Sequence, residues 1–224
     1  MKIGAFLCDI MAGVENGRFV DIFVAAKAAN KAGITAVDLP LWMIEKYGFN
    51  PEELADKLKK IGIEITSVHY NVNCDYTDKN SINKGVQELK KAMELATKTT
   101  AKNFMIILSP LDFFDFSKQE AFKTEVRRVM SELVDYCCGL GLTPTIENYS
   151  LPIYPYSTIE DIKWLMDNNP SLMFNYDSGN FTCSEIDEVE GAAAFAGRTV
   201  HAHIKDWLGP PLINGIWAPQ NSLA

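Results

Sequence analysis

This 224-residue sequence has no long apolar run, an odd number of cysteines and only three histidines. No apolar run approaches the roughly 20 residues of a membrane-spanning helix, and Asp9 interrupts the N-terminal apolar stretch, which argues against a secretory leader. The odd number of cysteines and the lack of CxxC spacing argue against a disulfide framework or a thiolate zinc site. These residues are Cys8, Cys74, Cys137, Cys138 and Cys183. We therefore expect a cytoplasmic protein with reduced thiols and no membrane partner.

An excess of positive charge is also missing. The formal net charge is −8 and the isoelectric point is about 4.9, so the sequence offers no general attraction for nucleic-acid phosphates. With 47% hydrophobic and 22% charged residues, the composition is that of one ordinary globular domain. A small polar molecule is therefore a better expected partner than a nucleic acid.

A short apolar strand followed by an amphipathic helical segment recurs along the whole chain. The interval between the starts of consecutive strands is long enough for one strand and one helix, and it leaves no room for a second domain. Helix signals fill the intervals: Asn50 and Pro51 open one helix, and Gly62 closes it. This alternation predicts a parallel sheet. The seven predicted strands are 3–8, 35–41, 64–70, 104–109, 143–147, 172–177 and 199–204.

Polar residues at the strand ends favour a barrel over a doubly wound sheet. The glycine-rich turn typical of dinucleotide-binding sheets does not follow the first strand. Instead, ionisable residues fall at the C-terminal ends of several different strands, where barrel enzymes build their sites. They are Asp38, His69, Glu147, Asp177 and His203. We predict an α/β fold, a parallel TIM-type (β/α) barrel with about seven of its eight units present.

Three of these strand ends carry the predicted chemistry. Glu147 lies in Thr145-Ile146-Glu147-Asn148, Asp177 opens Asp177-Ser178-Gly179-Asn180, and His203 opens His203-Ile204-Lys205-Asp206. Strand ends on one rim converge, so these side chains can meet around one ion. Two carboxylates and an imidazole suit Mn²⁺, Mg²⁺, Co²⁺ or Zn²⁺.

The IEN, DSGN and HIKD segments, in this order and spacing, resemble strands five, six and seven of the xylose-isomerase-like barrel superfamily. That family includes sugar isomerases, ketose 3-epimerases, inosose dehydratases and endonuclease IV, and the resemblance extends from Ile3 to Trp207. It implies that Glu147, Asp177 and His203 are the metal ligands. It also implies that His69, Asn180 and Lys205 face the substrate, a small-molecule sugar or sugar phosphate. We assign catalytic roles to Glu147 and Lys205.

The resemblance fails at the family's fourth ligand, a glutamate on strand eight. At about 33 residues per unit, that strand would start near position 230, beyond the last residue. Residues 208–224 contain no charged residue and no histidine. We therefore expect a barrel domain at 1–207 followed by an atypical tail at 208–224, and catalysis weakened by the loss of the last unit. Unpaired strand edges would favour a homo-oligomer.

Several residues near the strand ends leave two interpretations open. Trp42 and Tyr70 are predicted to line a sugar pocket through their apolar faces, although aromatic residues there also simply plug barrel mouths. His201 shares a face with His203 and is predicted to pack beside the ligands or support them rather than to bind the ion. Lys205 contacts either the substrate or Asp206.

The predicted function is a divalent-metal-dependent isomerase or epimerase. Ketose 3-epimerases of the family carry a second glutamate where this chain has Ile153, which disfavours that subtype. An inosose-type dehydratase, or a non-catalytic sugar-binding remnant, is the alternative. An endonuclease IV-like enzyme needs three ions and additional histidines, and this chain has only three, with Asn180 in place of one of them. A nuclease is therefore disfavoured.

Overall fold

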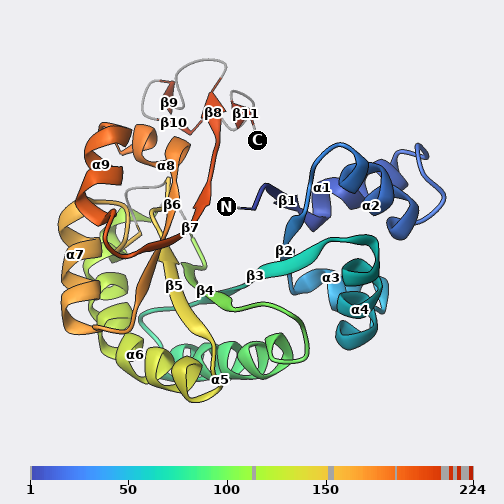
Figure 1. The fold of residues 1–224 in the computed structure, drawn as a ribbon. Coiled ribbons are helices and arrows are strands. Elements are labelled where there is room, and N and C mark those ends of the chain that lie inside the picture. Colours follow the sequence, from blue (N-terminus) through green and yellow to red (C-terminus); the bar gives the residue numbers. More distant parts are fainter. Residues whose placement is uncertain are drawn as a thin grey trace.

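The structure is a computed structural model of the chain, and it describes residues 2–112, 115–150, 154–184, 186–207, 212–213, 216–217 and 222–223. Its main element is a curled, seven-stranded parallel sheet whose strands follow one another in chain order (Figure 1). The predicted fold, a TIM-type sheet of seven units, is confirmed. The strands are β1 (Gly4–Phe6), β2 (Ala36–Pro40), β3 (Glu64–Cys74), β4 (Asn103–Pro110), β5 (Thr143–Glu147), β6 (Met173–Asp177) and β7 (Thr199–His203).

All seven predicted strands form, with bounds close to those predicted. The largest difference is at β3, which continues to Cys74 instead of ending at residue 70. Pairing with β4 explains the extension, because the register is unbroken from Ser67 opposite Asn103 to Cys74 opposite Pro110. The local sequence of a strand does not reveal how far pairing with its neighbour will lengthen it.

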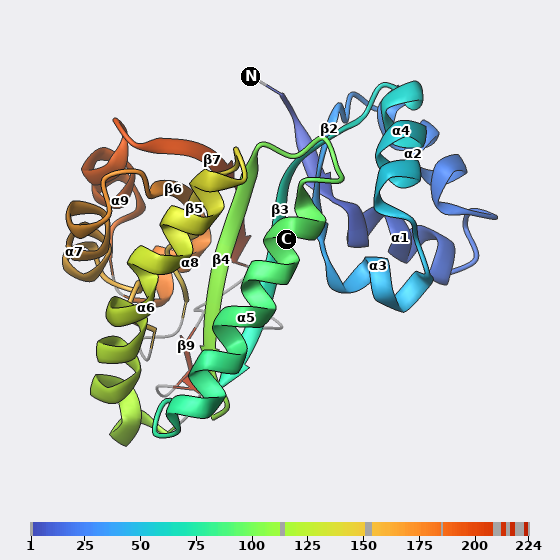
Figure 2. The ribbon, with the colours of Figure 1, turned by 90° about the horizontal axis from the view of Figure 1, so that it is seen from below.

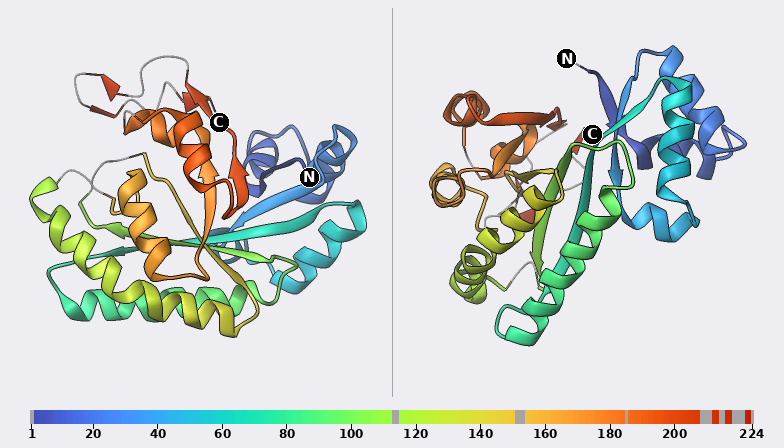
Figure 3. Two further views of the ribbon diagram at one scale, coloured as in Figure 1. Left: turned by 60° about the vertical axis from the view of Figure 1, so that its left-hand side comes forward. Right: turned by 60° about the horizontal axis from the view of Figure 1, so that its bottom comes forward.

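Helices cover the outer face of the sheet. Figures 2 and 3 show α5 and α6 running beside each other, α5 along the outside of β3 and β4 and α6 along that of β4 and β5. The predicted N-cap at Asn50 is confirmed, since its side chain accepts a hydrogen bond from the backbone N–H of Glu53 at 3.0 Å. The helices are α1 (Leu7–Glu15), α2 (Ile22–Lys31), α3 (Trp42–Tyr47), α4 (Pro51–Ile61), α5 (Lys79–Ala96), α6 (Gln119–Gly139), α7 (Ile159–Asn168), α8 (Ser178–Cys183) and α9 (Glu188–Phe195).

Side-chain alternation along the strands separates an apolar layer from a polar interior. In β2, Val37 and Leu39 are fully buried in the core that joins the sheet to its helices. Asp38, between them, points to the opposite face, where it meets histidines of β7. Polar groups of several strands thus share the inner face of the curled sheet, where the site is found.

Beyond β7 the described residues form only two-residue strands. β8 (Asp206–Trp207) pairs with β11 (Ser222–Leu223), and β9 (Leu212–Ile213) pairs with β10 (Ile216–Trp217), both antiparallel. Most of the predicted tail at 208–224 lies outside the described residues, so its boundary stays a prediction. Across the described ranges, no helix is long and apolar enough to cross a membrane.

Candidate metal centre

The structure brings Glu147, Asp177 and His203 together at the carboxyl ends of β5, β6 and β7. One potential ligand atom from each lies within 4.8 Å of the others, and Nδ1 of His203 is 2.5 Å from Oε2 of Glu147. All three side chains are largely buried. The prediction that these residues meet at one rim therefore agrees with the structure, while their role as metal ligands stays a prediction.

Asp177 is held by the start of α8. Its Oδ1 accepts hydrogen bonds from the backbone N–H groups of Gly179 and Asn180, each at 2.9 Å, so the carboxylate also caps the helix. Asn148 fixes the backbone at this point, because its side chain bonds to both the N–H and the C=O of Asp177 at 2.8 Å. Oδ2 of Asp177 remains directed toward Nζ of Lys205, 3.3 Å away.

Two asparagines hold the carboxylate of Glu147. Nδ2 of Asn175 donates to Oε2 at 2.7 Å, and Nδ2 of Asn180 donates to Oε1 at 3.1 Å. Lys205 in turn donates to Oδ1 of Asn180 at 2.5 Å. The predicted substrate residues Asn180 and Lys205 therefore lie within this network. Sequence reasoning missed Asn175, although its position two residues before Asp177 on the same strand was a usable signal.

A second cluster on the inner face contains Asp38, His201 and His203. Oδ2 of Asp38 accepts from Nε2 of His201 at 2.9 Å and from Nε2 of His203 at 2.8 Å. His201 thus lies beside the predicted ligands, and its partner is the carboxylate of Asp38. The potential ligand atoms of this cluster also lie within 4.8 Å of one another. The two clusters share only His203.

Burial and charge act in opposite directions on these side chains. Burial raises the pKa of Asp38, but hydrogen bonds from His201 and His203 outweigh it and lower the value to about 2. Burial lowers the pKa of His203, yet the Glu147 charge and hydrogen bonds with Asp38 and Glu147 raise it to about 10. The pKa of Asp177 is raised to about 6 by burial and by the charge of Glu147. The centre thus concentrates negative charge around one imidazole.

His69 lies on the inner face of β3, with its ring edge-on to Phe6 at a centroid distance of 5.9 Å. Its Nδ1 is buried and has no hydrogen-bond partner among the described residues. Burial lowers the pKa of His69 to about 4, although the charges of Asp38 and Glu147 oppose this. The imidazole is therefore neutral at physiological pH and retains an unused polar atom.

The structure does not bring Trp42 and Tyr70 to the centre. Trp42 begins α3, is 45% exposed, and contacts Lys46 and Tyr47 of the same helix. Tyr70 shares the outer face of β3 with Val72, which lies beside Gly85 of α5. The alternation of β3 places His69 inward and Tyr70 outward, which the strand-end argument overlooked. Ile153, which disfavoured a ketose 3-epimerase, lies outside the described residues.

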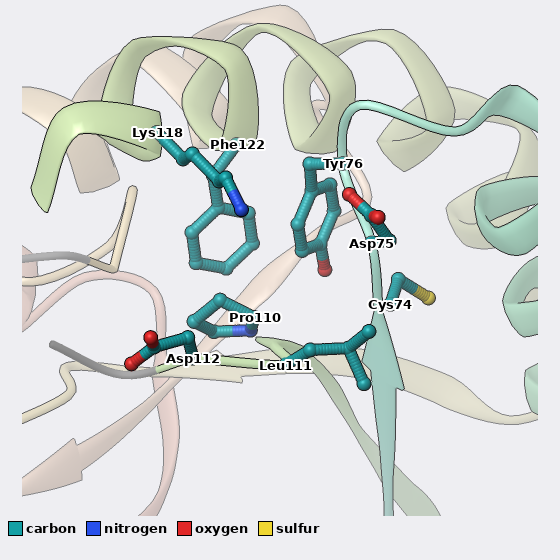
Figure 4. Close-up of a pocket in the computed structure, with 8 residues that line it drawn as sticks. All are labelled: Cys74, Asp75, Tyr76, Pro110, Leu111, Asp112, Lys118 and Phe122. Atoms are coloured by element: carbon teal, nitrogen blue, oxygen red, sulfur yellow. The ribbon is translucent and has the colours of Figure 1, made fainter. Parts of the chain in front are cut away.

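A cavity of about 60 Å³ lies past the ends of β3 and β4, beside the start of α6 (Figure 4). The rings of Tyr76 and Phe122 pack against each other in its lining, with centroids 4.1 Å apart, and Lys118 extends from above them. None of the three predicted ligands lines this cavity. Cys74, at its edge, lies beside Gly85 of α5 on the outer face of the sheet. The cavity is therefore distinct from the candidate metal centre.

The chain belongs to the xylose isomerase-like TIM barrel family, whose model matches residues 26–215. This confirms the family that the IEN, DSGN and HIKD segments indicated. No curated protein matches the chain significantly.

Solved structures share the fold at low sequence identity. The probable 3-DHS dehydratase AsbF of Bacillus anthracis, involved in petrobactin synthesis, is 17% identical with a TM-score of 0.69, covering 96% of this chain and 76% of its own. The IolI protein, solved with a zinc atom, is 18% identical with a TM-score of 0.71. The match covers 86% of this chain and 70% of IolI. A sugar phosphate isomerase/epimerase of Parabacteroides distasonis is 16% identical with a TM-score of 0.69. The match covers 92% of this chain and 78% of that protein. At these identities the likeness shows a shared fold.

Proposed function

We propose that this protein is a divalent-metal-dependent isomerase or epimerase of a small sugar or sugar phosphate. The observation that carries the proposal is the meeting of Glu147, Asp177 and His203 within 4.8 Å at the carboxyl ends of three strands. Two carboxylates and one imidazole form a donor set that Mn²⁺, Mg²⁺, Co²⁺ and Zn²⁺ accept. A zinc atom in the structurally similar IolI protein supports the same assignment.

The residues around the centre suit carbonyl chemistry. An ion held there would polarise a substrate carbonyl and acidify the adjacent C–H bond. Lys205, 3.3 Å from Asp177, supplies a cation for a substrate oxygen that gains negative charge. We assign the neutral imidazole of His69, on the inner face of β3, to a substrate hydroxyl. We assign proton transfer at the reacting carbon to Glu147.

A dehydratase of an inosose-type ketone is the second candidate. The likeness to the dehydratase AsbF favours it, and loss of water beside a carbonyl begins with the same acidified C–H bond. The product separates the two functions, because dehydration gives an unsaturated ketone that absorbs in the ultraviolet.

The test combines calorimetric Mn²⁺ binding with ²H exchange in D₂O, measured by NMR over a panel of free and phosphorylated ketoses and inososes. We expect ²H uptake at the carbon beside the carbonyl, together with interconverted sugars, and at least a ~100-fold lower rate in Glu147→Gln. The matched control is Glu52→Gln, an exposed residue in the first turn of α4. Metal and sugar binding without ²H uptake would reduce the protein to a sugar-binding module, and no metal binding would refute the proposal.

A further inference from the structure

His203 is bonded through both of its ring nitrogens. Nδ1 faces Oε2 of Glu147 at 2.5 Å, and Nε2 faces Oδ2 of Asp38 at 2.8 Å. These nitrogens lie on different edges of the imidazole, so the ring spans two carboxylates from β5 and β2. Phe6 packs against the same ring, with centroids 4.7 Å apart, and restricts its rotation.

Asp38 lies outside the cluster of predicted ligands. Glu147 and Asp177 form one group of three with His203, whereas Asp38 forms another with His201 and His203. Asp38 is 6% exposed, and Oδ2, the same oxygen, accepts from both histidines. It therefore approaches His203 from the side opposite Glu147, as a group that acts through the imidazole.

We propose that Asp38 is the positioning residue of the metal centre. When the ring gives up its Nδ1 proton on binding a metal, the bond from Nε2–H to Asp38 would leave the Nδ1 lone pair facing the group formed by Glu147 and Asp177. A carboxylate on the second nitrogen of a metal-binding histidine fixes its tautomer and raises its basicity. The inference rests on the metal centre of the proposed function. It gives a role to the carboxylate of Asp38 in β2, which the sequence indicated only as an ionisable residue at a strand end.

His201 serves Asp38 as a second donor. Its ring stands nearly perpendicular to that of His203, at an interplanar angle of 87° and a centroid distance of 5.3 Å. With two N–H groups directed at one oxygen, the carboxylate of Asp38 keeps its orientation even when one of them moves. Removing His201 should therefore matter much less than removing Asp38.

The experiment compares the wild type with Asp38→Ala, Asp38→Asn and His201→Ala. Calorimetry measures Mn²⁺ and Zn²⁺ affinity, and ¹H–¹⁵N NMR of the Zn²⁺-loaded protein reads which nitrogen of His203 carries hydrogen. We expect Asp38→Ala to weaken metal binding about 10- to 100-fold, as outer partners of ligands usually do. Asp38→Asn, which keeps an acceptor oxygen, should recover part of this loss, and His201→Ala should stay within about threefold of the wild type. Circular dichroism confirms that each variant is folded.

The wild-type spectrum should show a protonated Nε2 that exchanges slowly with solvent, and this proton should exchange faster in Asp38→Asn. Wild-type affinity in a folded Asp38 variant, or zinc bound to Nε2 of His203, would overturn the inference while leaving the proposed function intact. Absence of metal binding in the wild type would overturn both. Loss of affinity in His201→Ala equal to that in Asp38→Ala would assign the role to the pair of histidines instead.

Discussion

At the scale of single residues, the candidate centre gathers more negative charge than one imidazole can neutralise. Asp38, Glu147 and Asp177 surround His203, and Lys205 is the cation beside Asp177. The arrangement is costly to bury without a positive partner, because like charges in a low-dielectric site repel each other. A divalent ion would supply that charge.

The pKa of His203 predicts how the metal-free protein responds to pH. Contacts with Glu147 and Asp38 raise this pKa from 6.5 to about 10, so the folded state favours the protonated ring. The stability this provides is complete below pH 6.5 and is lost as pH rises toward about 10. Thermal unfolding in EDTA should therefore show a midpoint that falls across this window. His203→Gln should flatten the profile, and an equally steep profile in that variant would assign the effect elsewhere.

At the scale of elements, the sequence predicted the strands and the meeting of three of their polar ends well, while the metal-binding role of those residues stays a prediction. Apolar strands ending in Glu147, Asp177 or His203 are local patterns, and parallel pairing turns them into neighbours. Contacts between distant strands were harder to predict. Nothing local to Asp38 indicates that it bonds to residues 163 and 165 positions away. Tyr70 illustrates a local difficulty. Adjacent residues of a strand point to opposite faces of the sheet, and Tyr70 directly follows the inward-facing His69.

The packing of α5 on β3 gives a prediction at the same scale. A Cβ on Gly85 would lie 2.4 Å from Sγ of Cys74 and 2.9 Å from a methyl carbon of Val72, so the helix would have to move. Gly85→Ala should lower the free energy of unfolding by about 1–3 kcal/mol, as overpacking does. The matched variant is Gly139→Ala in α6, where a Cβ meets nothing within 4 Å. It should be neutral or stabilising by up to about 1 kcal/mol in urea unfolding. Equal effects at both sites would contradict the packing argument.

At the scale of the whole molecule, the described sheet has two ends, β1 and β7. Val200 in β7 is 42% exposed and Ile204 just after it is 82% exposed, on the side opposite His201 and His203. An end strand invites pairing with another chain, and apolar side chains exposed beside it favour burial in such a contact. A homo-oligomer through β7 is therefore a proposal that this edge supports.

Substitution at that edge tests the oligomer. Ile204→Lys should shift the protein from dimer toward monomer in sedimentation velocity, because a lysine buried in a contact beside β7 is costly. Val189→Lys is the control, since Val189 is 72% exposed on α9. A wild type that sediments as a monomer at high concentration would refute the proposal.

The hydrogen bond between Asp38 and His203 also has a consequence for folding. Neighbouring strands in this sheet are consecutive in the chain, so pairing joins segments of modest separation. The Asp38–His203 contact instead closes a loop of 165 residues, with a correspondingly large loss of chain entropy. During synthesis, the first six strands can assemble while β7 is still being made, but the site cannot. The candidate metal centre would then form only once β7 has joined the sheet.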